Sequence, residues 1–204
     1  MGVAVLIEGE SGTGKSASLR NFKPEEISII NVDSKPFPFK NGKDFKKVLC
    51  TDNAEKIIAA MKRSTSKVIV IDDAQYIMAN AYMRKANVKG YDKYVEIGVD
   101  FFNIVEAVKE LPDDVIVYFF MHTEETNGGI IKAKTIGKML DTTITLEGKF
   151  TIVLRTLVKD GNYYFTTQNC GYDTVKTPMG MFEENEIPND TKYVDTKIRD
   201  YYEM

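Results

Sequence analysis

Residues 9–16 read Gly-Glu-Ser-Gly-Thr-Gly-Lys-Ser and match the pattern G-x-x-x-x-G-K-[ST] at every fixed position. They directly follow the apolar run 3–7, which is typical of a strand buried on both faces. Glycines allow a backbone to turn sharply, so that successive N–H groups can point at one anion. The sequence therefore predicts a strand, a phosphate-binding loop and a helix in succession.

Within this loop we expect the Lys15 ammonium to reach the β- and γ-phosphates of a nucleotide and the Ser16 hydroxyl to coordinate Mg²⁺. A helix expected from Lys15 to Phe22 would add its positive N-terminal end. The chain has no N-K-x-D motif, which would read guanine, so ATP is favoured. The expected nucleotide-binding residues are Gly9, Glu10, Ser11, Gly12, Thr13, Gly14, Lys15, Ser16 and Ala17.

A second buried strand, predicted at 68–71, ends in two acidic residues, Asp72 and Asp73. Open α/β sheets bind ligands at the carboxyl ends of their strands. We expect Asp72 to hold Mg²⁺ through water, and Asp73 to orient or deprotonate the attacking water. Asp33, which ends another apolar run, is a rival base, and Glu8 is a third candidate.

The only histidine, His122, follows the strand predicted at 114–121. That strand usually lies beside the strand that leads to the phosphate loop, so His122 could sense the γ-phosphate, with Thr123 as a helper. A lone histidine is equally consistent with a purely structural role.

Strand and helix patterns alternate over the first two thirds of the 204 residues. This alternation predicts an α/β fold with a mainly parallel sheet and helices on both faces. Asp160-Gly161 between two strand-like runs predicts a C-terminal β-hairpin at about 150–168. We expect one core over 1–182, followed by an acidic C-terminal tail over 183–204 that shows little periodicity.

Charge and cysteine content exclude several classes of protein. Lys plus Arg number 27 and Asp plus Glu 30, and the net charge of −3 excludes a uniformly basic protein but not a local basic surface. Cys50 and Cys170 lack a metal-binding spacing, so reduced thiols are expected. No apolar run is long enough to span a membrane and no signal peptide is present, so we expect a cytoplasmic protein.

Two stretches combine basic residues with few acids. In 82–94, basic residues alternate with three tyrosines, a pattern that can hold single-stranded DNA by stacking and phosphate contacts. A solvated face whose tyrosines pack on the core is the alternative. The stretch 128–138 could touch nucleic acid or reach the nucleotide of a neighbouring subunit. The candidate DNA-binding residues are Arg84, Lys85, Lys89, Lys93, Tyr91, Tyr94, Lys132 and Lys134.

The phosphate loop, the strand that ends in Asp72, His122 and the late hairpin together resemble a RecA-like P-loop ATPase of the phage type. More closely, residues 3–182 are similar to small phage-encoded AAA-type nucleotide-binding proteins. The segments similar to the C-terminal half of those proteins are 134–140, 150–169 and 178–182.

This resemblance implies a RecA-like P-loop NTPase core that couples ATP hydrolysis to the pairing of single-stranded DNA during phage recombination. It also implies a homo-oligomer with the nucleotide near a subunit interface, and it makes a single-strand-binding protein an expected partner. A neighbour would donate a cation to the γ-phosphate, and the candidates are Arg155, Lys132, Lys134 and Lys138. The strand that ends at Asp33 lacks the glutamate that RecA-like enzymes commonly use as base, so we expect slow hydrolysis.

Two further classes of function stay open. A nucleotide-dependent assembly factor or motor subunit without DNA contact would use the basic stretches to bind a protein partner. A small-molecule kinase normally needs an arginine-rich lid over the phosphates, and the five arginines of this chain are not clustered, which disfavours that class.

Overall fold

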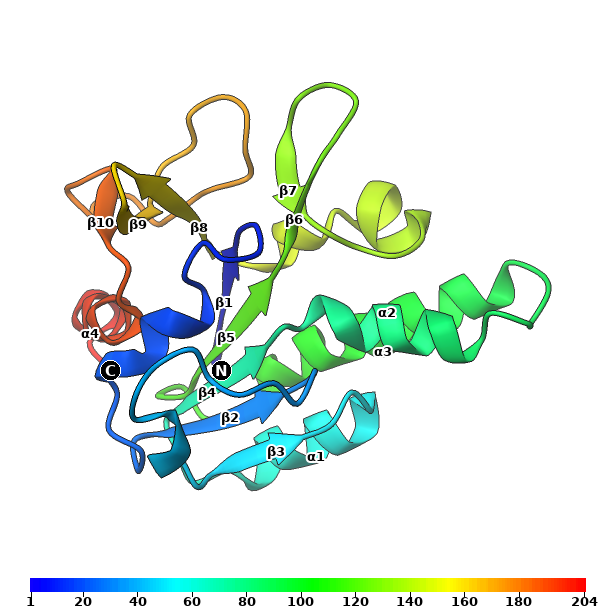
Figure 1. Cartoon of the computed structure of the whole chain (residues 1–204), viewed down its shortest axis with the longest axis horizontal. Helices are drawn as coiled ribbons and strands as arrows, with labels where there is room; N and C mark the ends of the chain where they lie inside the picture. The colour runs from blue at the N-terminus through cyan, green and yellow to red at the C-terminus, as the bar shows by residue number, and fades with distance from the viewer.

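A computed structural model describes all 204 residues and shows an α/β fold built on an eight-stranded sheet (Figure 1). The strands are β1 (Val3–Glu8), β2 (Ile27–Asn31), β3 (Val48–Cys50), β4 (Val68–Asp72), β5 (Ile116–Met121), β6 (Thr123–Glu125), β7 (Ile131–Ala133), β8 (Ile152–Lys159), β9 (Asn162–Thr166) and β10 (Glu186–Pro188). The α-helices are α1 (Ala54–Arg63), α2 (Gln75–Arg84), α3 (Asp92–Ala107) and α4 (Thr191–Tyr202). Short 3-10 helices are η1 (Ser16–Asn21), η2 (Gly42–Asp44), η3 (Val108–Glu110) and η5 (Leu146–Lys149), and η4 (Met139–Ile144) is a π-helix.

The strand order of the large sheet is β10-β9-β8-β1-β5-β4-β2-β3, and it confirms a mainly parallel sheet. The central strand β1 pairs in parallel with β5 and β8, and β5 pairs in parallel with β4. Only the pairs that β9 makes with β8 and β10 are antiparallel. Because β1, β4 and β5 are parallel, the segments that follow their carboxyl ends meet at one edge of the sheet.

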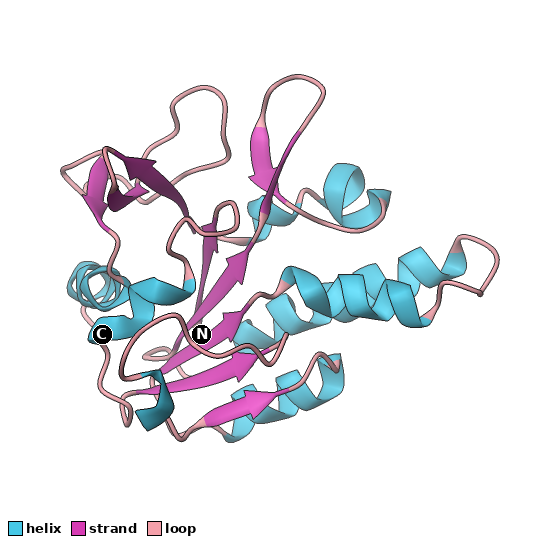
Figure 2. Ribbon diagram, viewed as in Figure 1, coloured by secondary structure: helices cyan, strands magenta, loops and turns pink.

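Helices cover both faces of the sheet, as expected (Figure 2). Every residue of β4 and β5 is buried, as the continuous apolar runs predict. Since side chains alternate along a strand, β1 directs Leu6 into one core and Val5 and Ile7 into the other. Helices α1, α2 and α3 close the first core, and η1 and α4 close the second.

The segment after the phosphate loop differs from the expected helix. It forms the 3-10 helix η1, which is shorter and more tightly wound than the α-helix expected from Lys15 to Phe22. Tertiary contacts hold it, because Leu19 is fully buried and the Ser18 hydroxyl lies 2.6 Å from the Thr191 hydroxyl. A six-residue 3-10 helix has a smaller dipole than the expected α-helix, so the N–H groups of the loop would supply most of the positive potential.

The C-terminal segment 183–204, expected as an acidic tail with little periodicity, forms the strand β10 and the helix α4. Strand β10 extends the sheet beside β9, and α4 packs Val194 and Ile198 fully into the second core. The Asp190 side chain caps α4 by accepting hydrogen bonds from two backbone N–H groups. The few buried residues of α4 lie among acidic and basic residues, so the sequence does not clearly predict this helix.

Two other regions differ in detail from the sequence expectations. The segment 122–142, for which no strand is predicted, contains the antiparallel pair β6 and β7 as well as η4. The short edge strand β3 was not expected. The hairpin expected at about 150–168 is formed by β8 and β9, with Asp160 and Gly161 at φ 52° and 76° in its turn.

None of the helices has the length and apolarity that a bilayer span requires.

Candidate functional site

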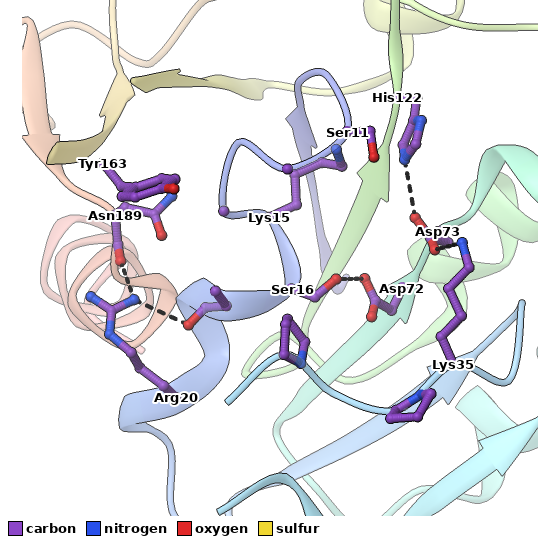
Figure 3. A pocket seen from close by; sticks show the side chains of 15 residues that line it. Ser11, Lys15, Ser16, Arg20, Lys35, Asp72, Asp73, His122, Tyr163 and Asn189 are labelled. Atoms are coloured by element: carbon purple, nitrogen blue, oxygen red, sulfur yellow. Dashed lines mark hydrogen bonds and ion pairs between the residues drawn. The ribbon is translucent and has the colours of Figure 1, made fainter. Parts of the chain in front are cut away.

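A cavity of about 590 Å³ opens over the loop 9–16 at the carboxyl edge of the sheet (Figure 3). One part of its wall comes from the ends of β1, β2, β4 and β5. Another part comes from Tyr163 of β9 and from Asn189, which precedes α4. Most of the predicted site residues therefore meet in one place. Those that line the cavity are Ser11, Gly12, Gly14, Lys15, Ser16, Ala17, Asp72, Asp73 and His122.

The Lys15 side chain folds back onto its own loop. Its Nζ donates hydrogen bonds to the carbonyl oxygens of Gly9 at 2.8 Å and Glu10 at 2.7 Å, and the residue is only 5% exposed. Gly12 and Gly14 adopt φ values of 80° and 96°, which L side chains rarely adopt, so the loop depends on glycine there. The loop thus holds a buried ammonium group against the cavity.

The remaining loop residues, Gly9, Glu10 and Thr13, do not line the cavity and instead fix the loop to the sheet. The Thr13 hydroxyl donates to the Glu10 carbonyl oxygen at 2.7 Å and lies 2.6 Å from the Thr156 hydroxyl of β8. A Cβ on Gly9 would overlap Oγ1 of Thr156, so this position accepts only glycine. Glycine is thus required at 12 and 14 by the backbone conformation and at 9 by the packing against Thr156.

Ser16 and Asp72 are joined directly. The Ser16 hydroxyl donates a 2.8 Å hydrogen bond to Oδ1 of Asp72, which ends β4 and is 6% exposed. Burial, and then the charge of Asp73, raises the pKa of Asp72 to about 6, against the hydrogen bond from Ser16 and the charge of Lys15. Burial likewise lowers the pKa of Lys15 to about 8, although Asp73 and Asp72 oppose that change. Both groups are destabilised in their charged forms and would gain from a bound ligand of opposite charge.

Asp73 follows Asp72 with a left-handed backbone, at φ 60°, which turns its carboxylate toward the cavity. Its Oδ1 lies 3.4 Å from His122 Nε2, and its Oδ2 lies 3.3 Å from Lys35 Nζ. Burial alone would raise the pKa of Asp73, but the hydrogen bond with His122 and the charge of Lys35 lower it to about 2. Asp73 is therefore held as a carboxylate between two donors. The His122 ring also packs edge-on against Tyr76.

The two other candidate bases do not reach the cavity. Asp33 forms an ion pair with Lys35 at 2.7 Å but does not line the cavity. Glu8 is fully buried, and its Oε1 accepts a 3.1 Å hydrogen bond from the Thr174 hydroxyl. Burial raises the pKa of Glu8 to about 8, so it is mostly protonated at neutral pH. Thr123, the expected helper of His122, is also outside the lining. Of the three candidate carboxylates, Asp73 alone lines the cavity.

Besides Pro36 and Pro38, four lining residues were not expected from the sequence: Arg20, Lys35, Tyr163 and Asn189. Lys35 comes from the loop after β2, and Tyr163 and Asn189 come from the C-terminal part of the chain, which no short motif marks. A polar residue just after a buried strand could have indicated Lys35. Nothing in the local sequence indicates the other three, because long-range packing places them.

The donor set fits a divalent cation held together with a polyanion. No group of three or more His, Cys, Asp or Glu side chains forms a metal cage. Mg²⁺ is commonly bound by one or two carboxylates together with substrate phosphates and waters, and Ser16 and Asp72 offer such hard oxygen ligands. The raised pKa of Asp72 indicates a buried carboxylate that a cation would stabilise.

The basic residues of 82–94 lie on the arm formed by α2 and α3, which projects from the body of the molecule (Figure 1). Arg84 pairs with Asp52 at 2.6 Å, and Lys85 pairs with Glu96. Lys89 forms no ion pair and is exposed. Part of the basic charge expected for DNA is thus neutralised within the chain.

The tyrosines of this arm gather near its tip. Tyr91 is 85% exposed, while the Tyr82 and Tyr94 rings lie 5.5 Å apart with Lys93 Nζ 5.3 and 5.4 Å from their centroids. A Cβ on Gly137 would lie 3.3 Å from Tyr94, so the stretches 82–94 and 128–138 meet there. The two basic stretches, which are separate in the sequence, are therefore neighbours in the structure.

The candidate trans-acting cations differ in their accessibility. Lys132 pairs with Asp141, whereas Lys134 and Lys138 are exposed and form no ion pair. Arg155 is less accessible than these lysines, because its side chain is only 12% exposed and its Nη2 pairs with Asp173 Oδ2 at 3.2 Å. Lys134 and Lys138 are the remaining candidates with free ammonium groups.

Neither a scan against models of protein families nor a search of curated proteins finds a match to this chain.

Proposed function

We propose that the protein is a RecA-like P-loop ATPase that binds ATP with Mg²⁺ over the loop 9–16, hydrolyses it, and acts on single-stranded DNA as an oligomer. The observation that carries this proposal is the arrangement of Lys15, Ser16, Asp72 and Asp73 around one cavity. The order of the strands also supports it, since β5 with His122 at its end lies beside β1.

The phosphates of ATP would lie over the loop, where backbone N–H groups and Lys15 supply positive charge. The ammonium group now donates to Gly9 and Glu10, and a β- or γ-phosphate oxygen is a stronger acceptor than a carbonyl oxygen. Lys15 would therefore turn to the phosphates without a large movement of the backbone. Its lowered pKa would rise again beside the anion.

Ser16 and Asp72 would hold Mg²⁺, which neutralises charge that develops on the phosphate oxygens. Ser16 already lies within hydrogen-bond distance of the carboxylate, so both oxygens are placed before a ligand arrives. Such preorganisation reduces the cost of ordering the site on binding.

Asp73 would orient the attacking water. The water oxygen forms a bond to the γ-phosphorus, the bond to the bridging oxygen of ADP breaks, and Asp73 receives the proton of the water. A pKa of about 2 makes Asp73 a weak base while Lys35 and His122 hold it. Slow hydrolysis is consistent with that arrangement, and His122 can respond to the γ-phosphate because it contacts Asp73.

Single-stranded DNA is the proposed partner because the arm carries an exposed Tyr91 beside Lys89 and Lys93. Lys134 or Lys138 would reach the nucleotide of a neighbouring subunit in the oligomer. A single-strand-binding protein is a further proposed partner.

The test is the rate of ATP hydrolysis with and without single-stranded DNA, together with binding to labelled oligonucleotides at several salt concentrations. We expect hydrolysis that DNA stimulates, and binding that weakens as salt rises, because lysine contacts release counterions. Absence of salt-dependent binding in every nucleotide state would refute the DNA part of the proposal.

A nucleotide-dependent assembly factor or motor subunit is the second candidate, and the internal ion pairs of Arg84 and Lys85 favour it. The same arm exposes Met83 and Val88 by 68% and 52%, which suits a protein partner. Alanine at Lys85, Lys89 and Lys93 separates the candidates: unchanged DNA affinity in the folded variant would favour the assembly factor.

A further inference from the structure

The cavity has two ends, and only one of them serves the reacting phosphate. Figure 3 shows Asp73 and His122 on one side of Lys15, and Tyr163, Asn189 and Arg20 on the other. The second end contains no carboxylate and has an aromatic ring and an amide instead. The Arg20 guanidinium is already engaged, because its Nη1 donates to the carbonyl oxygens of Ala17 at 3.0 Å and Asn189 at 2.8 Å. The ring and the amide that remain call for a part of the ligand other than phosphate or metal.

Asn189 is the least explained residue of this end. It is 2% exposed, and its Nδ2 atom is buried without a hydrogen-bond partner. Its backbone is fixed, because its N–H donates to the Tyr163 carbonyl oxygen at 3.2 Å and its carbonyl oxygen accepts from Arg20 Nη1 at 2.8 Å. Buried polar groups are rarely left unpaired, so a donor held in a cavity wall indicates an acceptor on the ligand.

Tyr163 completes the wall directly beside the phosphate loop. Its ring is part of the cavity lining and the residue is 48% exposed. A Cβ on Gly14 would lie 3.0 Å from Tyr163 Cδ1 and 3.1 Å from Asn189 Oδ1. A nucleotide whose phosphates rest on the loop therefore has this wall within reach of its other end.

We propose that Tyr163 and Asn189 bind the base of the nucleotide, that Arg20 positions Asn189, and that the base is adenine. This inference rests on the proposed ATP site. An aromatic ring supplies a stacking surface for a base. An amide carries one donor and one acceptor side, and these match N7 and the N6 amino group of adenine. The corresponding edge of guanine offers two acceptors, N7 and O6, and leaves the amide oxygen unpaired.

The C-terminal segment thereby becomes part of the nucleotide site. Asn21 Nδ2 donates to Asp190 Oδ2 at 2.7 Å, and the Ser18 and Thr191 hydroxyls lie 2.6 Å apart. These contacts join the start of α4 to η1, so Asn189 keeps its position relative to the loop. Fixed geometry of this kind is what a specific base contact requires.

The test measures the affinities of Mg-ATP, Mg-GTP and Mg-tripolyphosphate by calorimetry, in the full chain and in Tyr163→Ala and Asn189→Leu. The second variant keeps the approximate shape of the side chain, adds no charge, and removes its donor and acceptor. We expect about tenfold weaker ATP binding in each variant, with tripolyphosphate binding unchanged, since only the base contacts are lost. Tyr201→Ala, which removes a tyrosine of similar exposure outside the cavity, is the matched control and should bind all three ligands normally.

The wild-type chain gives a second readout that needs no variant: ATP should bind more tightly than both GTP and tripolyphosphate. Equal affinity for ATP and tripolyphosphate would overturn the base site while leaving the phosphate site in place. An equal loss of both ligands in the two variants would also overturn it. Failure of wild type to bind any of the three ligands would instead refute the proposed function, and the base site with it.

Discussion

Ser16 and Asp72, which are 56 residues apart in the sequence, share a 2.8 Å hydrogen bond at the carboxyl edge of the sheet. The bond connects the phosphate loop after β1 to the end of β4, across the intervening strand β5. The Asp72 carboxylate at this bond is buried, and burial makes its charged form unfavourable in the unliganded protein. The ionised carboxylate therefore lowers the free energy of unfolding, and the proposed Mg²⁺ would relieve that cost.

Asp72→Asn should stabilise the unliganded protein at pH 7 and abolish binding that depends on Mg²⁺. The pKa of Asp72 is raised from 3.8 to about 6 on folding, so its ionisation opposes folding by an amount on the order of 3 kcal/mol at neutral pH. The effect is absent below about pH 4, grows as pH rises from 4 to 6 because only the unfolded state ionises there, and stays constant above about pH 6. Thermal unfolding at pH 4 and pH 7 measures this effect, with Asp200→Asn, at an exposed position outside the cavity, as the control. A wild type that is more stable than Asp72→Asn at pH 7 would contradict the prediction.

Asp73→Asn should lower the rate of hydrolysis by about 10²- to 10⁴-fold, the usual contribution of a positioned base, while ATP still binds. Asparagine tolerates the left-handed backbone at this position, so the fold should persist. Asp33→Asn is the matched control, because Asp33 touches the same Lys35 but does not line the cavity. Phosphate release by both variants, measured side by side, tests the assignment. Full activity in Asp73→Asn would exclude Asp73 from the reaction.

Lys35→Met should raise the pKa of Asp73 from about 2 toward its ordinary range, because the variant removes a cation 3.3 Å from its carboxylate. Carbon-detected NMR titration of the side-chain carboxyl groups measures that pKa directly. Lys46→Met, at an exposed lysine outside the cavity, should leave it unchanged. An unaltered Asp73 titration in Lys35→Met would show that the contact does not persist in solution.

The pH dependence of kcat/KM with Mg-ATP should be bell-shaped, with limbs near pH 6 and pH 8. Asp72 must be ionised to bind the cation, so activity is lost as pH falls through about 6. Lys15 must be protonated to bind phosphate, so activity is also lost as pH rises through about 8. Binding of tripolyphosphate without metal, followed from pH 7 upward, isolates the Lys15 limb. A flat profile between pH 5 and 9 would contradict both assignments.

The sequence predicts those residues of the site that belong to short local motifs. The motif at 9–16 and the acidic end of the run 68–71 each combine a buried strand with a short polar signature, and parallel strands bring such ends together. Asn189 and Tyr163 have no such signature, since they reach the cavity only through the packing of α4 and β9. The strand and helix of residues 183–204 were not predicted, because the buried stripe of α4 is narrow and is flanked by charges.

The choice among the three candidate bases also needed the structure. Asp33, Asp73 and Glu8 all stand at strand ends, and a sequence cannot say which carboxylates face the cavity. Which carboxylate faces the cavity depends on the alternation of side chains along each strand and on the left-handed φ of Asp73. The same holds for Arg155, whose partner Asp173 comes from a distant loop.

The most direct test of the account is the release of phosphate from ATP by wild type and by Lys15→Ala in the presence of Mg²⁺. Lys15 is a buried ammonium group with a lowered pKa, so alanine should not prevent folding, which circular dichroism can verify. We predict measurable turnover by wild type and a loss of at least about 10³-fold in Lys15→Ala, because the charge on the transferring phosphoryl group loses its stabilisation. Turnover by the folded variant at the rate of wild type would contradict the account, as would a wild type that releases no phosphate.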